Sequence, residues 1–315
     1  MLLTVADRLE YRFLRTFSEA DPPDDSDRSS DRPVPSPTVV SKFREVVKNG
    51  IRQGRRLTDD AVKEAATLVD EYRQSVLDRV VRTRWDAYML PQMKTSVTAI
   101  SEDFARKYDG ALDESTKRGW RIGSNAVTQS LVPFNITTPS ISTLLLESTL
   151  STNGEMIQGL TADARRNIMQ QVRLGALGKS REAVIEEIGA SLDQSLVFRS
   201  IRARAEAISA TETGKIFNTA SHQATLSAQT VSDRVVQEWL HAPPGAVRQP
   251  RPTHLALHGT TIKEGEMFNV SGYSAKHPHD SSLPASEVVF CACYSVANVL
   301  TDGVPAALAG PSQFI

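Results

Sequence analysis

The sequence predicts an α+β protein that is mostly α: a helical N-terminal half followed by a small mixed α/β C-terminal domain that ends on a Cys-x-Cys strand. Before about residue 230, apolar residues recur at three- and four-residue steps over long segments, which is the period of an α-helix. After Pro243, glycine, proline and histidine residues punctuate short apolar segments, which is typical of short strands joined by turns.

The composition describes a soluble globular protein, with 40% hydrophobic residues and a net charge of −1 over 315 residues. This balance gives no general electrostatic attraction to nucleic acid or to a membrane. The N-terminal stretch MLLTVADRLEYRFL carries Asp7, Arg8 and Glu10, so it lacks the apolar core of a signal peptide. No apolar run approaches the roughly 20 residues of a membrane-spanning helix. We therefore expect a protein that stays, or assembles, inside the cell that makes it.

We divide the chain into five segments. Residues 1–20 form an N-terminal arm, and residues 21–38, rich in Pro, Ser and Asp, form a flexible linker. Residues 39–155 form a helical region, residues 156–300 contain the C-terminal domain, and residues 301–315 form a tail. An arm on a flexible linker is typical of a docking peptide.

The first long helix is expected to begin at Thr58, which is a good N-cap followed by two acidic residues. It should end near Met89, before Pro91. Its apolar stripe consists of Val62, Ala65, Val69, Tyr72, Val76 and Val80. Such a long single stripe needs a partner helix or a neighbouring chain to cover it. Residues 131–155, with two prolines and many Ser and Thr, are expected to form an irregular connection.

A second helical block covers about residues 160–230. Thr161 and Ser180 are expected N-caps, and Gly175 and Gly178 should separate two helices. The third helix should begin near Val197.

That third helix carries a carboxylate on its apolar stripe. The stripe consists of Ile201, Ala205, Ile208, Glu212, Ile216 and Thr219, at steps of three and four residues. Burying a carboxylate is costly unless it is paired or hydrogen-bonded. We therefore expect Glu212 to have a basic or donor partner; the alternative is that it lies at the edge of the stripe and reaches water.

The only two cysteines of the chain lie in the run VVFCACY, whose β-branched and aromatic residues favour a strand. Because strand side chains alternate, Cys291 and Cys293 should share one face, with Phe290, Ala292 and Tyr294 on the other. A disulfide between them would be badly strained, so we expect reduced thiols in a reducing compartment. They could be small core residues or half of a metal site.

His254 and His258 are four residues apart and would share one face of a helix. A metalloprotease helix has a glutamate after its first histidine, but Leu255 stands there. With Cys291 and Cys293, the two histidines could form a four-ligand zinc site. The alternative, which we favour from the sequence, is small core thiols and loop histidines with no cofactor and no catalytic residue.

The order of these features resembles the C-terminal domain of the phage Mu F-like family of minor head and head morphogenesis proteins. That family typically has an A-R-T-E motif followed by N, then R-x-x-H with a glycine, a Y-P-x-D-like turn and C-R-C. The matching residues are Thr211, Glu212, Asn218, Arg251, His254, Gly259, Pro278, Asp280, Cys291 and Cys293. Ala210 and Ala292 depart from it, because the family usually has arginines there. The resemblance covers about residues 198–296.

The resemblance implies a structural protein of a tailed phage rather than an enzyme. It implies association with the portal, a role in head morphogenesis and in DNA packaging or delivery, and localisation to the virion, with the host cytoplasm as the place of assembly. Residues 156–300 would be the Mu F-like domain and residues 39–155 the docking region. The implied partners are the portal protein, the major capsid or scaffold protein and, as a further candidate, double-stranded DNA, with no membrane during assembly.

Two other function classes remain open from the sequence. One is a zinc-dependent toxin-like or nuclease enzyme that uses the His/Cys cluster. The other is a DNA-binding protein that uses residues 42–56, which contain six basic residues and one acidic residue. Phosphate contacts could use that face, although a solvated helix face has the same composition.

Overall fold

The computed structural model describes residues 35–83, 87–193, 200–241, 251–301 and 304–306. Residues 35–315 form one compact unit. The expected arm, most of the expected linker and most of the C-terminal tail lie outside the described residues.

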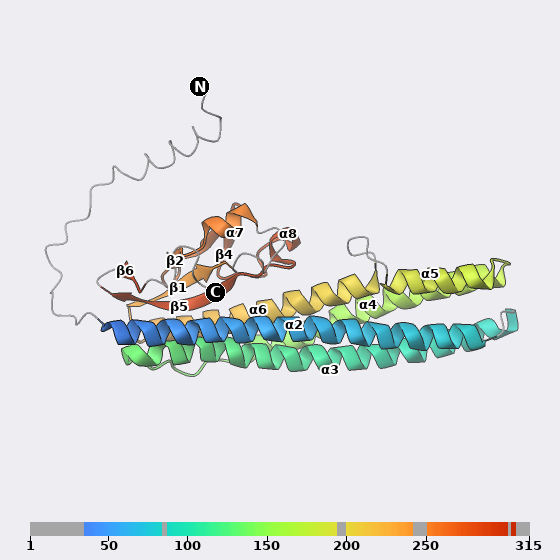
Figure 1. The fold of residues 1–315 in the computed structure, drawn as a ribbon, viewed down its shortest axis with the longest axis horizontal. Helices are drawn as coiled ribbons and strands as arrows, with labels where there is room; N and C mark the ends of the chain where they lie inside the picture. Colours follow the sequence, from blue (N-terminus) through green and yellow to red (C-terminus); the bar gives the residue numbers. More distant parts are fainter. Residues whose placement is uncertain (1–34, 84–86, 194–199, 242–250, 302–303, 307–315) are drawn as a thin grey trace, which may run out of the picture. The chain divides into compact units, whose positions relative to one another are not determined.

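Two long helices, α2 (Pro37–Arg82) and α3 (Leu90–Leu131), run side by side (Figure 1). The Ser36 side chain caps α2 by accepting a hydrogen bond from the Val39 amide at 3.4 Å. The prediction that the helix begins at Thr58 is wrong, because Thr58 lies inside α2 and its hydroxyl donates to the Gly54 carbonyl at 3.1 Å. A capping residue inside a helix can bond the preceding turn instead. The predicted end near Met89 is also wrong, because α2 ends at Arg82, and Pro91 lies in the first turn of α3, which begins at Leu90.

The apolar stripe of α2 is covered by the chain itself. Five of its six members are buried: Ala65, Val69, Tyr72, Val76 and Val80. They share a hydrophobic cluster with residues of α3, α4 (Leu144–Ala176), α5 (Arg181–Asp193) and α6 (Ile201–Gln229). The need for a partner helix is therefore confirmed, but no neighbouring chain is required. The stripe gives no support to docking through residues 39–155.

The connections between the helices agree in part with those predicted from the sequence. After η1 (Ala87–Met89), α3 and η2 (Val132–Phe134), an irregular segment leads to α4, so the predicted irregular connection is shorter than residues 131–155. Thr161 is not a cap, because it lies inside α4 and donates to the Ile157 carbonyl at 2.7 Å. Ser180 does cap α5, since its Oγ accepts from the Ala183 amide at 3.2 Å.

The third predicted helix is α6, which Ser200 caps by accepting from the Ala203 amide at 3.1 Å. It is buried on most sides and packs against α2 and α3 as well as the sheet. Glycines make this close approach possible: a Cβ on Gly123 of α3 would lie 2.3 Å from the Phe217 carbonyl oxygen of α6. The helix core of the protein is thus built around α6.

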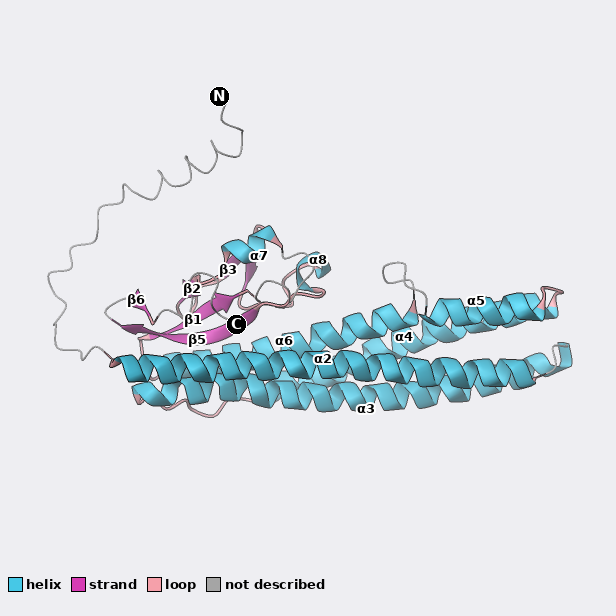
Figure 2. Cartoon of the chain, viewed as in Figure 1, coloured by secondary structure: helices cyan, strands magenta, loops and turns pink. Residues whose placement is uncertain are grey.

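The C-terminal part contains an antiparallel sheet of four strands in the order β2-β1-β5-β6 (Figure 2). Its strands are β1 (Val235–Leu240), β2 (Thr261–Ile262), β5 (Tyr294–Thr301) and β6 (Val304–Pro305). β1 pairs with β5 over its whole length, from Val235 opposite Val299 to Leu240 opposite Tyr294. The remaining elements are the hairpin β3 (Phe268–Val270) and β4 (Tyr273–Ala275) and the short helices α7 (Pro252–Ala256) and α8 (Ala285–Val288). The predicted α+β, mostly α class is confirmed.

The sheet is joined to the helices by a shared core. One cluster combines the start of α2, the end of α3, α6, β1 and β5, and it includes Phe43, Leu131, Phe217 and Tyr294. A second cluster lies among β1, β2, β3, β4 and the segment before β5, and it includes Trp239, Phe268 and Cys293. The proposed boundary at residue 155 falls within α4.

No helix within the described ranges is long and apolar enough to cross a membrane.

Candidate functional site

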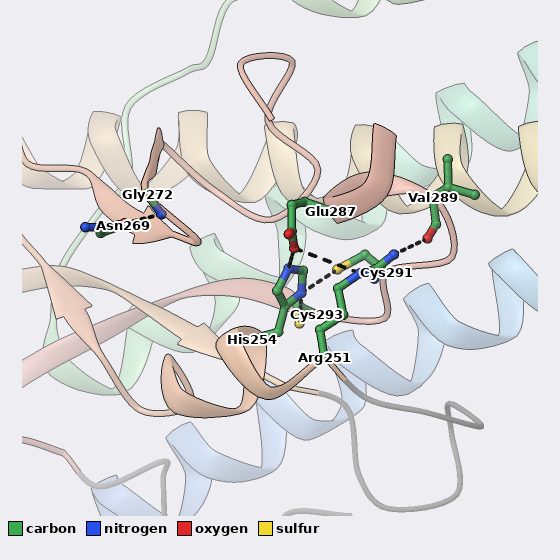
Figure 3. A network of polar contacts seen from close by, with 8 residues as sticks. All are labelled: Arg251, His254, Asn269, Gly272, Glu287, Val289, Cys291 and Cys293. Atoms are coloured by element: carbon green, nitrogen blue, oxygen red, sulfur yellow. Dashed lines mark hydrogen bonds and ion pairs between the residues drawn. The ribbon is translucent and has the colours of Figure 1, made fainter. Parts of the chain in front are cut away.

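Three of the four side chains that the sequence nominated as metal ligands come together. The Nδ1 of His254 lies 3.4 Å from the Sγ of Cys291 and 3.5 Å from the Sγ of Cys293 (Figure 3). These three atoms all lie within 4.8 Å of one another. His254 and Cys293 are buried, and Cys291 is half-buried. His254 thus meets two cysteines that lie 37 and 39 residues later in the sequence.

His254 is placed by the short helix α7, which follows Arg251 and begins with Pro252. The turn after α7 is joined to β1 by Gly259, whose amide donates to the Trp239 carbonyl at 2.8 Å. Gly259 has a φ of 81°, a conformation that favours glycine, so the matched motif glycine has a conformational role. The Trp239 ring packs edge-on against the imidazole, with centroids 5.6 Å apart. The histidine is therefore held between the sheet and its own turn.

The cysteines do not lie on a strand, so that prediction is wrong. β5 begins only at Tyr294, and the cysteines belong to the irregular segment between α8 and β5. Phe290 has a φ of 54°, and the Cys291 amide donates to the Val288 carbonyl at 3.0 Å. The β-branched residues before Cys291 complete α8 and a tight turn, because the strand pairing with β1 starts after Cys293. This turn brings both thiols to His254.

Glu287 fixes the orientation of His254. Its Oε2 lies 2.8 Å from the His254 Nε2 and 3.9 Å from the Nε of Arg251. A carboxylate only accepts hydrogen bonds, so the Nε2 of His254 carries a proton and donates it. Arg251 in turn donates from Nη2 to the Val289 carbonyl at 2.8 Å. The segment just before the cysteines is thus bonded to the residues around α7 (Figure 3).

The thiols and the imidazole change one another's pKa. A hydrogen bond from Cys293 holds the pKa of Cys291 well below its usual range, and His254 and His279 add to this effect. Burial raises the pKa of Cys293 well above its usual range, and the hydrogen bond to Cys291 adds to this effect. Burial alone would lower the pKa of His254, but the hydrogen bonds to Cys291 and Glu287 outweigh it and raise that pKa. Cys291 is therefore the more acidic of the two thiols.

His258 is not part of this group, which corrects the four-ligand prediction. α7 ends at Ala256, so His254 and His258 do not share a helix face. The Nδ1 of His258 instead accepts a hydrogen bond from the His241 amide at 3.1 Å. The i, i+4 spacing failed as a signal because the helix that it assumed is only five residues long.

A second network ties α6 to the cysteine segment. The Nδ2 of Asn218 donates to the Cys293 carbonyl at 3.1 Å, and its Oδ1 accepts from the Ser295 amide at 2.7 Å. The same Nδ2 lies 3.0 Å from the Nδ1 of His279, whose Nε2 lies 2.9 Å from the Cys291 carbonyl oxygen. The imidazole of His279 packs so closely on α6 that a Cβ on Gly214 would lie 2.9 Å from it. Asn218 and His279 therefore position the backbone of both cysteines.

A third polar group lies between α6, β1 and the loop after β4. The Nδ1 of His222 donates to the Gln237 Oε1 at 2.6 Å, and the Gln237 Nε2 donates to the Lys276 carbonyl and to the Ser295 Oγ, each at 2.7 Å. Burial, together with the nearby His222, lowers the pKa of His277 to about 4. This imidazole is neutral near neutral pH.

Asp280, a residue of the matched turn, shapes the loop that carries His277 and His279. Its carboxylate accepts hydrogen bonds from the Lys276 amide at 2.7 Å and the Ser282 amide at 2.9 Å. Burial would raise the pKa of Asp280, but these backbone hydrogen bonds outweigh it and lower that pKa. Asp280 is thus a turn-forming carboxylate, and the loop presents His279 to Asn218.

Glu212 is buried and paired, as the sequence predicted. Its Oε2 lies 3.2 Å from the Nζ of Lys215, three residues along α6. The alternative of a water-exposed carboxylate at the edge of the stripe is wrong. The neighbouring motif residue Thr211 is also buried, and its hydroxyl has no hydrogen-bond partner among the described residues.

Sequence reasoning missed three side chains that organise the site: Glu287, His279 and Gln237. Glu287 precedes the cysteines by only four residues, yet nothing in the local sequence says that a turn will point it at His254. His279 had a usable signal, because it lies in the histidine-rich segment KHPHD. Gln237 also had a usable sequence signal, because a polar residue inside a buried strand needs a hydrogen-bond partner.

No protein-family model matches the chain, and no significant similarity is found to a curated protein or to a solved structure.

Proposed function

We propose that this chain is a structural minor head protein of a tailed phage that associates with the portal and acts in head morphogenesis and in DNA packaging or delivery. The observation that carries the proposal is the convergence of the motif residues. Asn218, Arg251, His254, Cys291 and Cys293, which carry the resemblance to the Mu F-like family, lie in one connected region of the fold. Residues that match a family motif by chance have no reason to meet.

The bonds that these residues make support a structural role. Asn218 bonds the backbone on both sides of Tyr294, and Arg251 bonds the Val289 carbonyl. Asp280 holds two backbone amides, and Gly259 closes the turn after α7. Apart from the contacts of Asn218 with His279 and of Arg251 with Glu287, these bonds go to the backbone of the same chain, and such bonds specify a fold. These four matched residues therefore act by fixing the C-terminal part in place.

Burial of one apolar surface also bears on which part of the chain would contact the portal. The apolar stripe of α2 is buried within the chain, so it is not the contact surface. The expected arm, residues 1–20, and its linker remain as the proposed docking segment, because such a segment can order on binding. Residues 35–315 form a compact unit, which makes removal of the first 34 residues a practical test.

The experiment co-expresses the full chain with the tagged portal protein encoded in the same genome and purifies the portal. We expect the full chain to co-purify, and a chain beginning at Pro35 to bind more weakly. Equal binding of the two chains would overturn the role of the arm. Absence of binding by the full chain would overturn the portal association.

The basic segment 42–56 is part of α2, where Lys42, Arg52 and Arg56 are exposed and Phe43 and Val47 are buried. Double-stranded DNA remains a candidate partner of that exposed face. A DNA-binding protein would lose affinity steeply as salt is raised, because each phosphate contact releases counterions. Binding that is lost in a chain with Arg52→Gln and Arg56→Gln, but not with Lys263→Gln on the exposed turn after β2, would favour the DNA-binding alternative.

A further inference from the structure

We propose that His254, Cys291 and Cys293 bind one Zn²⁺ ion, with Glu287 as the residue that orients the histidine. This inference does not rest on the proposed function, because it follows from the positions of four side chains. The bound ion would join α7 to the segment before β5.

The first argument is geometric. In a tetrahedral site with Zn–S bonds of about 2.3 Å and Zn–N bonds of about 2.0–2.1 Å, a ligating sulfur and nitrogen lie about 3.5–3.6 Å apart. The two observed separations between the His254 Nδ1 and the sulfurs are 3.4 Å and 3.5 Å. Both sulfurs therefore already lie at nearly the distance from Nδ1 that a tetrahedral zinc ion imposes, and the three donor atoms all lie within 4.8 Å of one another.

The second argument is the orientation of the imidazole. Glu287 accepts the Nε2 proton of His254, which leaves the lone pair of a neutral imidazole on Nδ1, facing the sulfurs. A histidine ligand commonly donates its other ring N–H to a carboxylate, which fixes its tautomer and its direction. Arg251 lies 3.9 Å from the same carboxylate oxygen and helps to hold it. The partner that a metal-ligating histidine needs is thus present.

The third argument concerns charge. Two thiolates and a neutral imidazole bring two negative charges, which one Zn²⁺ ion balances. A buried charge is costly unless it is paired or coordinates a metal, and the Cys293 sulfur lies in a hydrophobic cluster with Trp239 and Phe268. With zinc bound, the cluster of ligands has no net charge in this apolar setting. Three protein ligands leave the fourth position to a water molecule.

The consequence for the fold is a cross-link between two separate segments. α7 is a helix of five residues, and the cysteine segment is irregular, so neither is held by a long run of backbone hydrogen bonds. A zinc ion bound to His254 and both cysteines would join these two segments beside the hydrophobic cluster that contains Trp239 and Phe268. Metal binding that joins two segments of a chain contributes folding free energy in this way.

The experiment uses the full chain without an affinity tag, incubated with zinc chloride and then desalted, with the metal measured by mass spectrometry. We expect one zinc per chain for the unmodified protein. Cys293→Ser and Cys291→Ser should each lose most of it. The matched control is His258→Ala, which removes a histidine four residues from His254 but outside the group, and it should retain one zinc per chain.

Two further measurements keep the proposal testable if a cysteine variant fails to fold. Replacing zinc by Co²⁺ in the unmodified chain should give the intense visible absorption of a tetrahedral cobalt–thiolate site, and a chelator should lower the melting temperature of the unmodified chain. Glu287→Gln should weaken zinc affinity by about 10- to 100-fold, as loss of an orienting partner does. Zinc absent from the unmodified chain, or retained equally by both cysteine variants, would overturn the proposal.

Discussion

Asn218 on α6 donates its side-chain amide to the main-chain carbonyl of Cys293, 75 residues later, at 3.1 Å. The same side chain accepts from the Ser295 amide, so it bonds the chain on both sides of the start of β5. These two bonds join the start of β5, the strand that pairs with β1, to α6. They also fix the backbone from which the Cys293 thiol projects toward His254.

Replacing Asn218 by alanine should therefore destabilise the protein. The change leaves the Cys293 carbonyl and the Ser295 amide buried without their partner, and each buried polar group left unsatisfied costs about 1–3 kcal/mol. We expect the free energy of unfolding in urea to fall by at least about 2 kcal/mol. Asn125→Ala, on an exposed position of α3, is the control and should change it little. Equal effects of the two substitutions would contradict this account of Asn218.

Glu212→Ala should cost about 1 kcal/mol, because it removes a buried carboxylate whose partner Lys215 is only partly shielded from water. A double-mutant cycle with Lys215→Ala measures the pair directly. The exposed Glu186→Ala on α5 serves as the control. A coupling energy of zero between Glu212 and Lys215 would show that the pair contributes nothing to stability.

The close approach of α3 and α6 predicts opposite effects at two glycines of one helix. Gly123→Ala places a methyl group 2.3 Å from the Phe217 carbonyl oxygen, and such overpacking costs about 1–3 kcal/mol. Gly110→Ala meets no atom within 4 Å and should stabilise α3 by about 0.5–1 kcal/mol through helix propensity. Thermal unfolding of both variants measures whether Gly123→Ala lowers the stability of the protein and Gly110→Ala raises it. A stable Gly123→Ala variant would mean that α3 and α6 are further apart than described.

Glu238 predicts a pH dependence of stability. Burial raises its pKa from 4.5 to about 7, against the opposing hydrogen bond from Asn298 at 2.6 Å. The folded state thus holds a proton that the unfolded state releases at lower pH. The stabilisation from this proton is complete below about pH 4.5 and is lost as the pH rises through about 7.

The variant Glu238→Gln, which cannot ionise, isolates this effect. Unfolding in urea between pH 5 and pH 8 should show the unmodified chain losing stability relative to the variant, by an amount on the order of 3 kcal/mol. The exposed Glu264→Gln should give a curve parallel to that of the unmodified chain. Parallel curves for Glu238→Gln as well would show that Glu238 ionises normally in the folded protein.

The sequence predicted what depends on periodicity and missed what depends on distant contacts. The helical stripe of α2 and the buried, paired Glu212 followed from three- and four-residue spacing, which a helix converts directly into a face. The start of α2 was misplaced because Thr58 has the residue type of an N-cap. The glycine one turn earlier, Gly54, lies inside the helix, where it allows a close approach to Phe217.

The site was predictable in part for the same reason. His254, Cys291 and Cys293 were nominated by residue type, since thiols and imidazoles are zinc ligands wherever they occur. Their arrangement was not predictable, because it depends on the left-handed conformation at Phe290 and on the end of α7 before His258. Glu287 escaped notice because a glutamate is ordinary at the surface and becomes informative only when a turn brings it against His254.

The central functional claim, that this chain is a minor component of a phage head, is tested most directly by the content of purified virions. Quantitative mass spectrometry of particles produced from the genome that encodes this chain, purified on a density gradient, measures its copy number against the portal protein. The account predicts that the chain is present at a fixed, low ratio to the portal and is retained after washing in high salt. Virions that contain the portal protein but lack this chain would contradict it.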